Sequence, residues 1–339
     1  MSDRPRIGVV GVGSLGFHHA RILASMDDVE VSGIHDARKD RMEDVARELS
    51  VPGLATLDAL LDASDALVVA VPTSDHEAVA VPALERGVHV LIEKPMAPEL
   101  AAADRILAAA RRRDVVVQIG HVERFNSAIL AAEPHLDRPL FVESHRMAPF
   151  SPRSTDVAVV LDLMIHDVDL VQSLVGTAIT DVAASGVPVL SPNVDIANAR
   201  LSFEGGAVAN LTASRISLER MRKIRIFQRS GYLSLNLADG TGEFLRLKGE
   251  LPAFGARPDS PDVSPGSPVG LAGLQDIVER VPLRGEGAEP LRKELENFRA
   301  AVLGHAPPAV SGEQGRAALA VALTIEERIR SHVADSRTT

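Results

Sequence analysis

The 339-residue chain has no cysteine and no tryptophan, and it has only one tyrosine and nine phenylalanines. The absence of cysteine excludes disulfides, thiolate catalysis, iron–sulfur clusters and zinc sites with sulfur ligands. A reduced, intracellular compartment is consistent with this composition. Because aromatic side chains are scarce, we expect polar side chains and backbone groups, rather than aromatic platforms, to hold a ligand.

A net positive charge and long apolar runs are absent as well. The chain has 36 basic and 46 acidic residues, a formal net charge of -10, so a nucleic acid or an anionic membrane would be repelled by the protein as a whole. No run of about 18 apolar residues occurs, and the first apolar segment is too short for a signal sequence. We therefore expect a cytoplasmic protein without nucleic-acid or membrane partners.

The first 120 residues alternate short β-branched runs with helical patterns. Apolar runs without alternation are typical of strands covered on both faces, and strand–helix alternation predicts a doubly wound parallel sheet. The length favours two domains, so we predict an α/β Rossmann domain at residues 1–121. The expected strands are Ile7–Val10, Val29–Ile34, Ala66–Val71, Val88–Ile92 and Val115–Ile119, and the expected helices lie near 14–25, 38–48, 75–85 and 98–112.

The pattern changes in the remainder, which predicts a second domain at residues 122–335 of the α+β class with a largely antiparallel, open-faced sheet. Gly205-Gly206 and Ser230-Gly231 predict hairpin turns. The proline-, glycine- and serine-rich stretch 249–290 predicts a long loop. The other expected elements are a helical segment near 123–136, a strand at Leu140–Arg146, a helix at 157–174, strands through 180–246, and helices near 290–303 and 312–331.

The motif Gly11-Val12-Gly13-Ser14-Leu15-Gly16 follows the first strand and opens the first helix. In this context the first glycine allows a tight turn, the second lets the backbone approach a pyrophosphate, and the third allows close helix–strand packing. The phosphate would lie at the helix N-terminus. The motif predicts a dinucleotide site; a glycine turn without a ligand is the alternative.

Asp36 lies twenty residues beyond Gly16, at the end of the second strand. A carboxylate there accepts hydrogen bonds from the adenosine ribose and repels a 2′-phosphate, which favours NAD over NADP. Arg38 and Lys39 follow directly and could neutralise such a phosphate if Asp36 turned away. A helix N-cap is the alternative role for Asp36.

Glu93-Lys94-Pro95 ends the fourth strand, at the edge of a parallel sheet where open α/β folds bind ligands. A lysine beside an oxidised nicotinamide feels a like charge, which lowers its pKa and suits it to proton exchange with a substrate hydroxyl. A surface salt bridge is the alternative interpretation.

Gly11–Gly16, the loop Val71–His76 and Glu93-Lys94-Pro95 resemble the N-terminal domain of the Gfo/Idh/MocA family of sugar and polyol oxidoreductases. Asp162–Asp169 resembles the family's helix motif of aspartate, three residues and histidine, and Glu294–Gly312 resembles its C-terminal helices. The resemblance implies a cofactor held by Gly11, Gly13, Ser14, Leu15, Gly16, Asp36, Arg38, Pro72, Thr73, His76, Glu93, Lys94 and His121.

In the family, the lysine and the histidine exchange protons with the reacting hydroxyl, and the aspartate binds the sugar or orients the histidine. Transferred here, these are Lys94, His166 and Asp162. Asp162 and His166 are spaced i, i+4 and so share a helix face. A metal bound by Asp162, His166 and Asp169, or a histidine satisfied within its helix, is the alternative; we expect no metal, since hydride transfer to NAD needs none.

Gly120–Asn126 and Met147–Phe150 resemble a subgroup of the family that includes UDP-N-acetylglucosamine 3-dehydrogenases. The resemblance implies oxidation of a secondary hydroxyl, with that sugar at C3 as the best single expectation. A dehydrogenase of inositol or another sugar, an NAD-dependent glycoside hydrolase and a ligand sensor are alternatives. Besides Lys94, Asp162 and His166, the candidates for substrate contact are Arg124, Asn126, Arg146 and Arg153; a solvated or interface position is the alternative for these arginines.

Basic residues are concentrated at 213–230, which carries six of them and a single acidic residue. On a strand, Arg220 and Arg222 would share one face, and Lys223 and Arg225 the other. This cluster predicts a protected sheet edge or an oligomer contact, with attraction of a diphosphate as the alternative. The family resemblance implies a homodimer or homotetramer formed through the open face of the second sheet.

Overall fold

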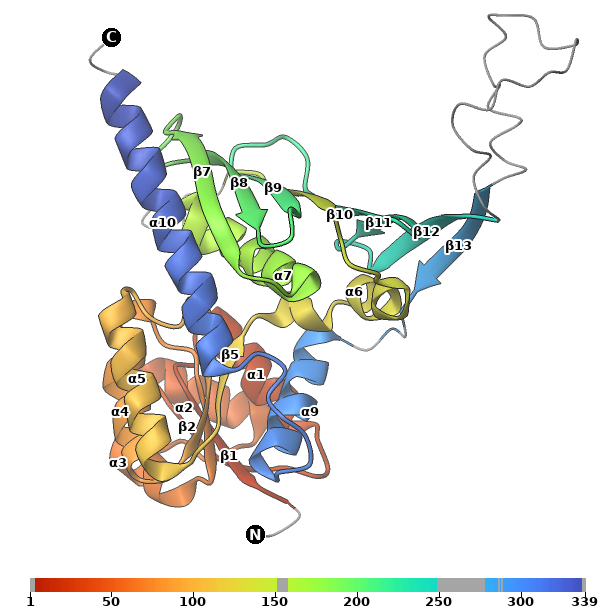
Figure 1. Ribbon diagram of the computed structural model, residues 1–339. Helices are drawn as coiled ribbons and strands as arrows, with labels where there is room; N and C mark the ends of the chain where they lie inside the picture. Colours follow the sequence, from red (N-terminus) through yellow and green to blue (C-terminus); the bar gives the residue numbers. More distant parts are fainter. Residues whose placement is uncertain (1–3, 151–157, 249–277, 286, 288, 337–339) are drawn as a thin grey trace, which may run out of the picture.

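The computed structural model describes residues 4–150, 158–248, 278–285, 287 and 289–336, and Figure 1 shows their arrangement. The chain forms two sheets that are each packed against helices, and the long helix α10 (Gly312–Ser336) contacts strands of both. The predicted combination of a Rossmann domain with an α+β domain is confirmed. No helix in these ranges is long and apolar enough to cross a membrane.

The first sheet is parallel, with the strand order β2-β1-β3-β4-β5. Its strands are β1 (Arg6–Val10), β2 (Glu30–His35), β3 (Ala66–Val69), β4 (His89–Glu93) and β5 (Val117–Gly120), and its helices are α1 (Ser14–Ala24), α2 (Lys39–Leu49), α3 (Leu57–Ala63), α4 (His76–Glu85) and α5 (Leu100–Arg113). The five predicted strands and four predicted helices are confirmed. The short helix α3 was not predicted; its N-cap, Thr56, accepts a hydrogen bond from the N–H of Ala59 at 3.2 Å.

Helices cover both faces of this sheet, and one of them comes from the far end of the chain. Helices α3, α4 and α5 share one buried cluster, and α1 and α2 share the other with α9 (Pro290–Val302). Helix α9 inserts Leu295 and Phe298, both fully buried, among residues of β1 and α1. The C-terminal segment thus completes the core of the first domain.

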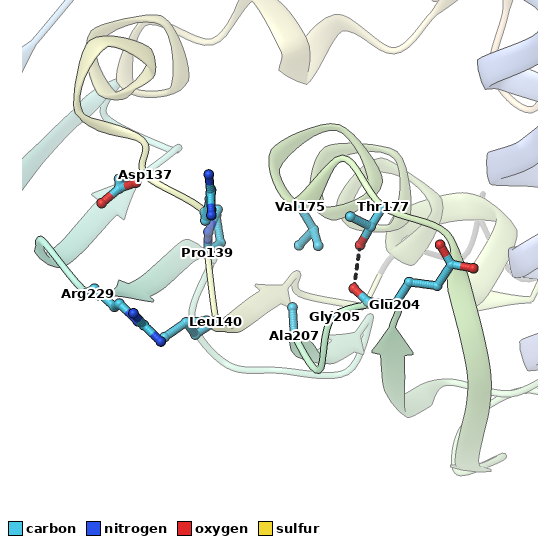
Figure 2. A pocket seen from close by; sticks show the side chains of 10 residues that line it. Asp137, Pro139, Leu140, Val175, Thr177, Glu204, Gly205, Ala207 and Arg229 are labelled. Carbon is cyan, nitrogen blue, oxygen red and sulfur yellow. Dashed lines mark hydrogen bonds between the residues drawn. The ribbon is translucent and has the colours of Figure 1, made fainter.

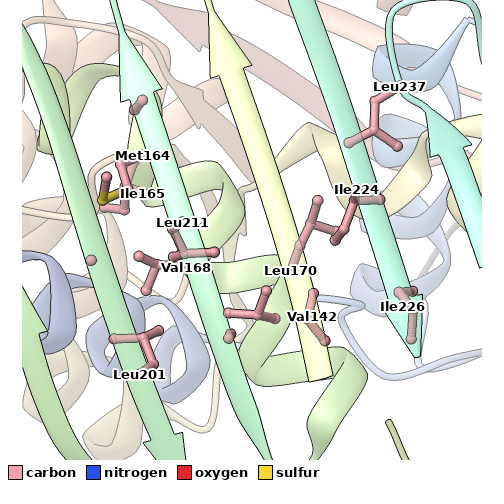
Figure 3. Packing of buried hydrophobic residues seen from close by; sticks show 14 of the residues in the cluster. Val142, Met164, Ile165, Val168, Leu170, Leu201, Leu211, Ile224, Ile226 and Leu237 are labelled. Atoms are coloured by element: carbon pink, nitrogen blue, oxygen red, sulfur yellow. The ribbon is translucent and has the colours of Figure 1, made fainter. Parts of the chain in front are cut away.

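The second sheet has eight strands in the order β13-β12-β11-β10-β6-β9-β8-β7, and β6 and β9 are its parallel pair. Its strands are β6 (Phe141–Met147), β7 (Ile179–Val187), β8 (Ile196–Phe203), β9 (Val208–Ser214), β10 (Met221–Gln228), β11 (Gly231–Asn236), β12 (Thr241–Leu247) and β13 (Val278–Arg284). Gly205-Gly206 lies in a hairpin turn as predicted. The second predicted hairpin is also present, but its turn is Arg229-Ser230, because Gly231 already pairs with Gln228 in the strands. Strands β6, β8, β9 and β10 direct apolar side chains toward α7 (Ile165–Val175), as Figure 3 shows.

Some of the elements expected in this half differ in the structure. The predicted loop 249–290 contains strand β13, which tolerates Pro282 because it is an edge strand; residues 249–277 lie outside the described residues. The helical segment predicted near 123–136 is divided into η2 (Val122–Phe125), α6 (Ser127–Ala132) and η3 (Glu133–His135). Asn126 has extended backbone angles and interrupts it.

The basic cluster at 213–230 is not a sheet edge. Strand β10 pairs with β11 on one side and with β6 on the other, so the prediction of a protected edge was wrong. The predicted alternation holds within the strand: Lys223 and Arg225 are exposed, whereas the side of Arg222 also carries the buried Ile224. Arg220 precedes the strand.

Replacing Phe298 tests whether α9 belongs to the first core. We expect Phe298→Ala to lower the free energy of unfolding by about 3–5 kcal/mol, because it leaves a cavity in a fully buried cluster. Glu296→Ala on the exposed side of the same helix should change it by less than about 0.5 kcal/mol. Urea unfolding followed by circular dichroism measures both, and equal small losses would show that α9 does not stabilise this core.

Candidate active site

The glycine turn leaves space at the N-terminus of α1 that fits a pyrophosphate. Gly13 is the N-cap of α1 and provides no side-chain cap, so the first N–H groups of the helix are available to an anion. A Cβ on Gly13 would meet nothing within 4 Å. A Cβ on Gly11 (φ +82°) would lie 2.7 Å from the carbonyl oxygen of Ala70, and one on Gly16 would overlap the carbonyl oxygen of Gly11. Gly11 and Gly16 therefore shape the turn, and Gly13 leaves room for the ligand.

Asp36 follows β2 and lies against this turn. Its Oδ2 accepts a hydrogen bond from the N–H of Val12 at 2.8 Å, and its Oδ1 accepts one from the N–H of Arg38 at 2.9 Å. The N-cap of α2 is Arg38, so Asp36 does not cap that helix. Each carboxylate oxygen keeps a second lone pair that could accept a ribose hydroxyl. The guanidinium of Arg38 is 3.8 Å from Asp36 and largely exposed.

Arg41 on α2 also supports the turn, and the sequence analysis missed it. Its Nε donates to the carbonyl of Val12 at 2.8 Å, and its guanidinium carbon lies 5.7 Å from the ring centre of Phe17. Both contacts fix α2 against the first turn of α1. A basic residue on a charged helix carries no sequence signal for this role.

The predicted cofactor loop at Pro72, Thr73 and His76 forms a 3-10 turn, η1 (Thr73–Asp75), that leads into α4. His76 is buried, with Nδ1 3.2 Å from the carbonyl oxygen of Met96 and Nε2 3.0 Å from that of Val71. Burial lowers the pKa of His76. This side chain therefore joins the loop to the segment after Lys94, and its contact with a cofactor stays a prediction.

Lys94 follows β4 and reaches the second domain. Its Nζ donates to the backbone carbonyl of Asp162 at 2.6 Å and lies 3.7 Å from Oδ1 of the same residue. Its side chain is only 18% exposed, so the alternative of a surface salt bridge is wrong. Burial lowers the pKa of Lys94, whereas the charges of Asp162 and Glu93 oppose this effect. A lowered pKa brings the ammonium closer to proton exchange at neutral pH.

Asp162 lies in a π-helical turn, η5 (Val160–Met164), directly before α7. The N–H of Ile165 bonds to the carbonyl of Val160, five residues earlier. The helix predicted over 157–174 is therefore not uniform. Single π turns often occur at functional sites, and here the carbonyl within the turn receives Lys94.

His166 and His121 lie close together, with ring centres 6.2 Å apart in an edge-to-face arrangement. Both ring nitrogens of His121 and Nδ1 of His166 are buried without a hydrogen-bond partner among the described residues. Burial lowers the pKa of both histidines, and the charges of Lys94 and Arg146 lower that of His166 further. His166 is consequently neutral near pH 7 and able to accept a proton.

The two described arginines among the substrate candidates are bound to carboxylates of α7. Arg146 is 3% exposed and holds Asp167 through two hydrogen bonds of 2.9 and 3.0 Å, and it donates to Glu123 at 2.8 Å. Arg124 holds Asp169 through bonds of 2.6 and 2.9 Å. Both pairs fix the helix that carries His166. Their burial does not match the solvated alternative.

Asn126 is also engaged with protein groups. Its Oδ1 accepts the N–H of Ala128 at 3.1 Å, which caps α6, and its Nδ2 donates to the carbonyl of Leu237 at 2.8 Å. Contact of Asn126, Arg124 or Arg146 with a substrate stays a prediction, and these bonds do not favour it. Arg153 lies outside the described residues.

A buried polar cluster lies behind Lys94 and was not predicted. Nε2 of His19 is hydrogen-bonded to Oε1 of Glu93 at 2.6 Å, and one ligand atom each of His19, Glu93 and Glu294 lie within 4.8 Å of one another. Glu294 on α9 is fully buried, and neither carboxylate oxygen has a partner among the described residues. Burial, and then the charge of Glu93, raises the pKa of Glu294 well above its usual range. A neutral acid explains this burial without a metal ion.

A separate pocket of about 470 Å³ lies at the opposite end of β6, where Leu140, Val175, Gly205 and Arg229 contribute to its lining (Figure 2). In Figure 2 the hydroxyl of Thr177 donates to the carbonyl of Glu204. None of the residues around Lys94 lines this pocket. The predicted catalytic residues are therefore not part of it.

Comparison with known proteins agrees with this geometry. Residues 5–121 match the model of the oxidoreductase family with an NAD-binding Rossmann fold, Gfo/Idh/MocA, and residues 118–234 match the Gfo/Idh/MocA C-terminal domain. The chain is 37% identical over 328 residues to UDP-N-acetylglucosamine 3-dehydrogenase of Acidithiobacillus ferrooxidans, which covers 96% of this chain and 97% of the relative. The chain belongs to the Gfo/Idh/MocA oxidoreductase family.

One solved structure and one further relative extend the comparison. A solved structure of the Acidithiobacillus ferrooxidans enzyme superposes with a TM-score of 0.85 at 34% identity, covering 97% of this chain and 98% of that one. The myo-inositol 2-dehydrogenase of Thermotoga maritima is 26% identical over 334 residues, which is 93% of each protein. Family members with different substrates thus match nearly the whole chain.

The residues predicted for acid–base chemistry in this Gfo/Idh/MocA oxidoreductase lie at the edge of the domain that carries the glycine turn and at α7, and their catalytic roles stay predictions. The glycine turn and Asp36 fit a dinucleotide, which supplies the hydride acceptor when it is bound. Nζ of Lys94 lies 3.7 Å from Oδ1 of Asp162, and the charge of Lys94 acts on His166. An alcohol placed between these side chains could transfer its hydroxyl proton to the neutral imidazole, or to Lys94 once its ammonium has lost a proton. The predicted catalytic residues are therefore brought together.

Gly13→Ala tests the cofactor assignment. The new methyl group meets no protein atom, so thermal stability should change little, but it would occupy space where the backbone approaches the pyrophosphate. We expect the Kd for NADH to rise by about 10-fold or more, measured by nucleotide fluorescence. Gly16→Ala, which clashes with backbone, should instead destabilise the fold. Unchanged NADH affinity in Gly13→Ala would contradict the assignment.

Glu294→Gln tests whether Glu294 is a neutral acid. Because the pKa of Glu294 is raised, its carboxyl group stays protonated in the folded protein at pH values above about 4.5, where the unfolded chain has lost this proton. The stabilising contribution of Glu294 therefore decreases as pH rises from there toward the raised pKa. Glutamine is neutral at every pH and lacks this decrease. The melting temperature of Glu294→Gln minus that of the wild type should therefore increase from pH 4.5 upward. A difference that does not change with pH would refute the neutral acid.

Proposed function

We propose that the protein is an NAD-dependent dehydrogenase that oxidises the C3 hydroxyl of UDP-N-acetylglucosamine to the 3-keto sugar. The observation that carries the reaction class is the placement of Lys94 against Asp162. The positive charge of Lys94 also lowers the pKa of His166, whose imidazole is neutral. The substrate is supported by the relative that is 37% identical over 96% of the chain and acts on this nucleotide sugar.

The proposed reaction balances without a further reactant. The C3 hydroxyl would lose its proton to His166 or to the neutral amine of Lys94, and a bound NAD would accept the hydride that leaves C3. A carbonyl replaces the alcohol, and the proton passes on to solvent. Lys94 fits this task because burial lowers the pKa of its ammonium, which favours the neutral amine that can accept a proton, and His166 fits it because its imidazole is neutral.

NAD rather than NADP is part of this proposal, because Asp36 is held next to the turn by hydrogen bonds from Val12 and Arg38, where its charge repels a 2′-phosphate. A cytoplasmic location and a homodimer or homotetramer through the open face of the second sheet also remain proposals. In that arrangement Lys223 and Arg225, exposed on β10, lie on the face available to another copy.

Oxidation of inositol is the second candidate, and the myo-inositol 2-dehydrogenase that matches over 93% of the chain supports it. The two substrates differ in charge as well as in size. A nucleotide sugar carries a diphosphate, whereas inositol is neutral, so the side chains around the reacting centre can discriminate between them.

Absorbance at 340 nm decides between the candidates. The purified protein should reduce NAD with UDP-N-acetylglucosamine, more slowly with NADP, and little with myo-inositol or scyllo-inositol. Lys94→Met removes the amine, so kcat should fall by about 100-fold or more while the Kd for NADH stays within about 2-fold. NADH formation with inositol alone would favour the second candidate, and full activity of Lys94→Met would exclude its catalytic role.

A further inference from the structure

Arg222 on β10 lies on the inner face of the second sheet, on the side of the reacting centre. The strand register pairs Arg222 with Arg146 on β6, so both side chains point to the face that is covered by α7. Burial of Ile224, two residues farther along the strand, marks the same face. Arg222 thus belongs to the predicted basic cluster but not to the exposed face of the sheet.

The guanidinium of Arg222 is poorly paired. Arg146 takes both oxygens of Asp167 and a 2.8 Å bond to Oε1 of Glu123, whereas Nη1 of Arg222 lies 3.4 Å from that same oxygen. Within the described part of the chain, no other hydrogen bond or ion pair holds the guanidinium of Arg222. Its side chain is 42% exposed, against 4% for Arg146. Most of its donors are therefore available to a ligand.

Arg222 is also close enough to the reacting centre to act on it electrostatically. Its positive charge is among those that lower the pKa of His166. Burial lowers the pKa of Arg222 itself, which means that its cation has lost part of its hydration. A partly desolvated guanidinium gains more from an anion than one fully surrounded by water.

We propose that Arg222 binds the diphosphate of a nucleoside-diphosphate sugar whose sugar ring lies at Lys94 and His166. This inference rests on the proposed function and deepens it, because it names the side chain that selects a charged substrate over a neutral polyol. A guanidinium forms two parallel hydrogen bonds with phosphate oxygens, which the hydroxyls of inositol cannot match in strength.

The arginines that were predicted to contact a substrate are less suited to this role. Arg146 and Arg124 each hold a carboxylate of α7 through two bonds, so binding a phosphate would require them to release the helix that carries His166. Arg222 can bind an anion at the cost of one long contact to Glu123. The geometry thus separates arginines that support the site from one that faces a ligand.

Strand β10 provides a matched control. Arg225 also has a single 3.4 Å contact, from Nη1 to Oε2 of Glu143, and its side chain is 44% exposed, but it lies on the opposite face of the sheet. Arg222→Ala and Arg225→Ala therefore remove the same charge and similar pairing from the same strand. Their difference isolates the effect of facing the site.

The test measures kinetics and binding with the full-length protein. For Arg222→Ala, we expect the KM for UDP-N-acetylglucosamine and the Kd for UDP, measured by calorimetry, to rise by about 10- to 100-fold, with kcat within about 3-fold. Arg225→Ala should match the wild type within about 2-fold. Arg222→Lys, which keeps the charge but not the fork, should recover part of the affinity. Equal melting temperatures verify that the variants are folded.

The outcomes separate this inference from the proposed function. If the wild type oxidises the nucleotide sugar and Arg222→Ala has the KM and UDP affinity of Arg225→Ala, the inference is overturned and the function stands. If the wild type does not oxidise it, UDP binding alone decides: weaker binding in Arg222→Ala than in Arg225→Ala supports an anion site at Arg222. Equal affinities, or no UDP binding to the wild type, overturn it.

Discussion

The contact between the Lys94 ammonium and the backbone carbonyl of Asp162 joins the two halves of this oxidoreductase. It connects the end of a Rossmann strand with a π turn of the second domain over 2.6 Å. The backbone carbonyl accepts the hydrogen bond of the lysine and leaves the side chain of Asp162 for other contacts. The carboxylate of Asp162, 3.7 Å away, remains able to contact a hydroxyl group. The alignment of the domains and the position of the lysine predicted to exchange protons thus depend on the same few atoms.

The π turn and the helix α7 that follows it are held by ion pairs with cations from three other segments of the chain. Asp162, Asp167 and Asp169 receive Lys94, Arg146 and Arg124, cations that come from β4, β6 and η2 respectively. Buried pairs of this kind contribute little net stability but strongly disfavour other arrangements, because separating them leaves an unpaired charge. The acidic run around His166 therefore sets where the imidazole lies, and its neutral state follows from burial among these cations.

The sequence was most informative where local chemistry dictates local structure. The glycine spacing at Gly11–Gly16 predicted the turn, because each position depends on the absence of a Cβ against nearby backbone or ligand. The β-branched runs predicted all five strands of the first sheet, since those strands are buried on both faces. Lys94, Asp162 and His166 were found through motifs, and the structure brings them together.

The features that the sequence did not reveal depend on partners far away in the chain. The basic residues of β10 predict an edge strand, and only the pairing with β6 shows that the strand is internal. Pro282 favours a loop, and only the pairing of β13 with β12 shows that it lies in an edge strand. The π turn at Asp162 has no periodic signature in so short a segment. An arginine that holds a carboxylate through two bonds and an arginine with a single long contact have the same sequence signal, and only their contacts distinguish Arg146 from Arg222.

Helix α9 determines when the core of the first domain can be completed during synthesis of the chain. The glycine turn and β1 are made long before α9, which contributes Leu295 and Phe298 to the core beneath them. The Rossmann segment therefore keeps part of its apolar surface exposed until α9 has been made and has packed against it. The two halves of this enzyme are separate in architecture but share this core, and a chain without α9 lacks part of its cofactor domain.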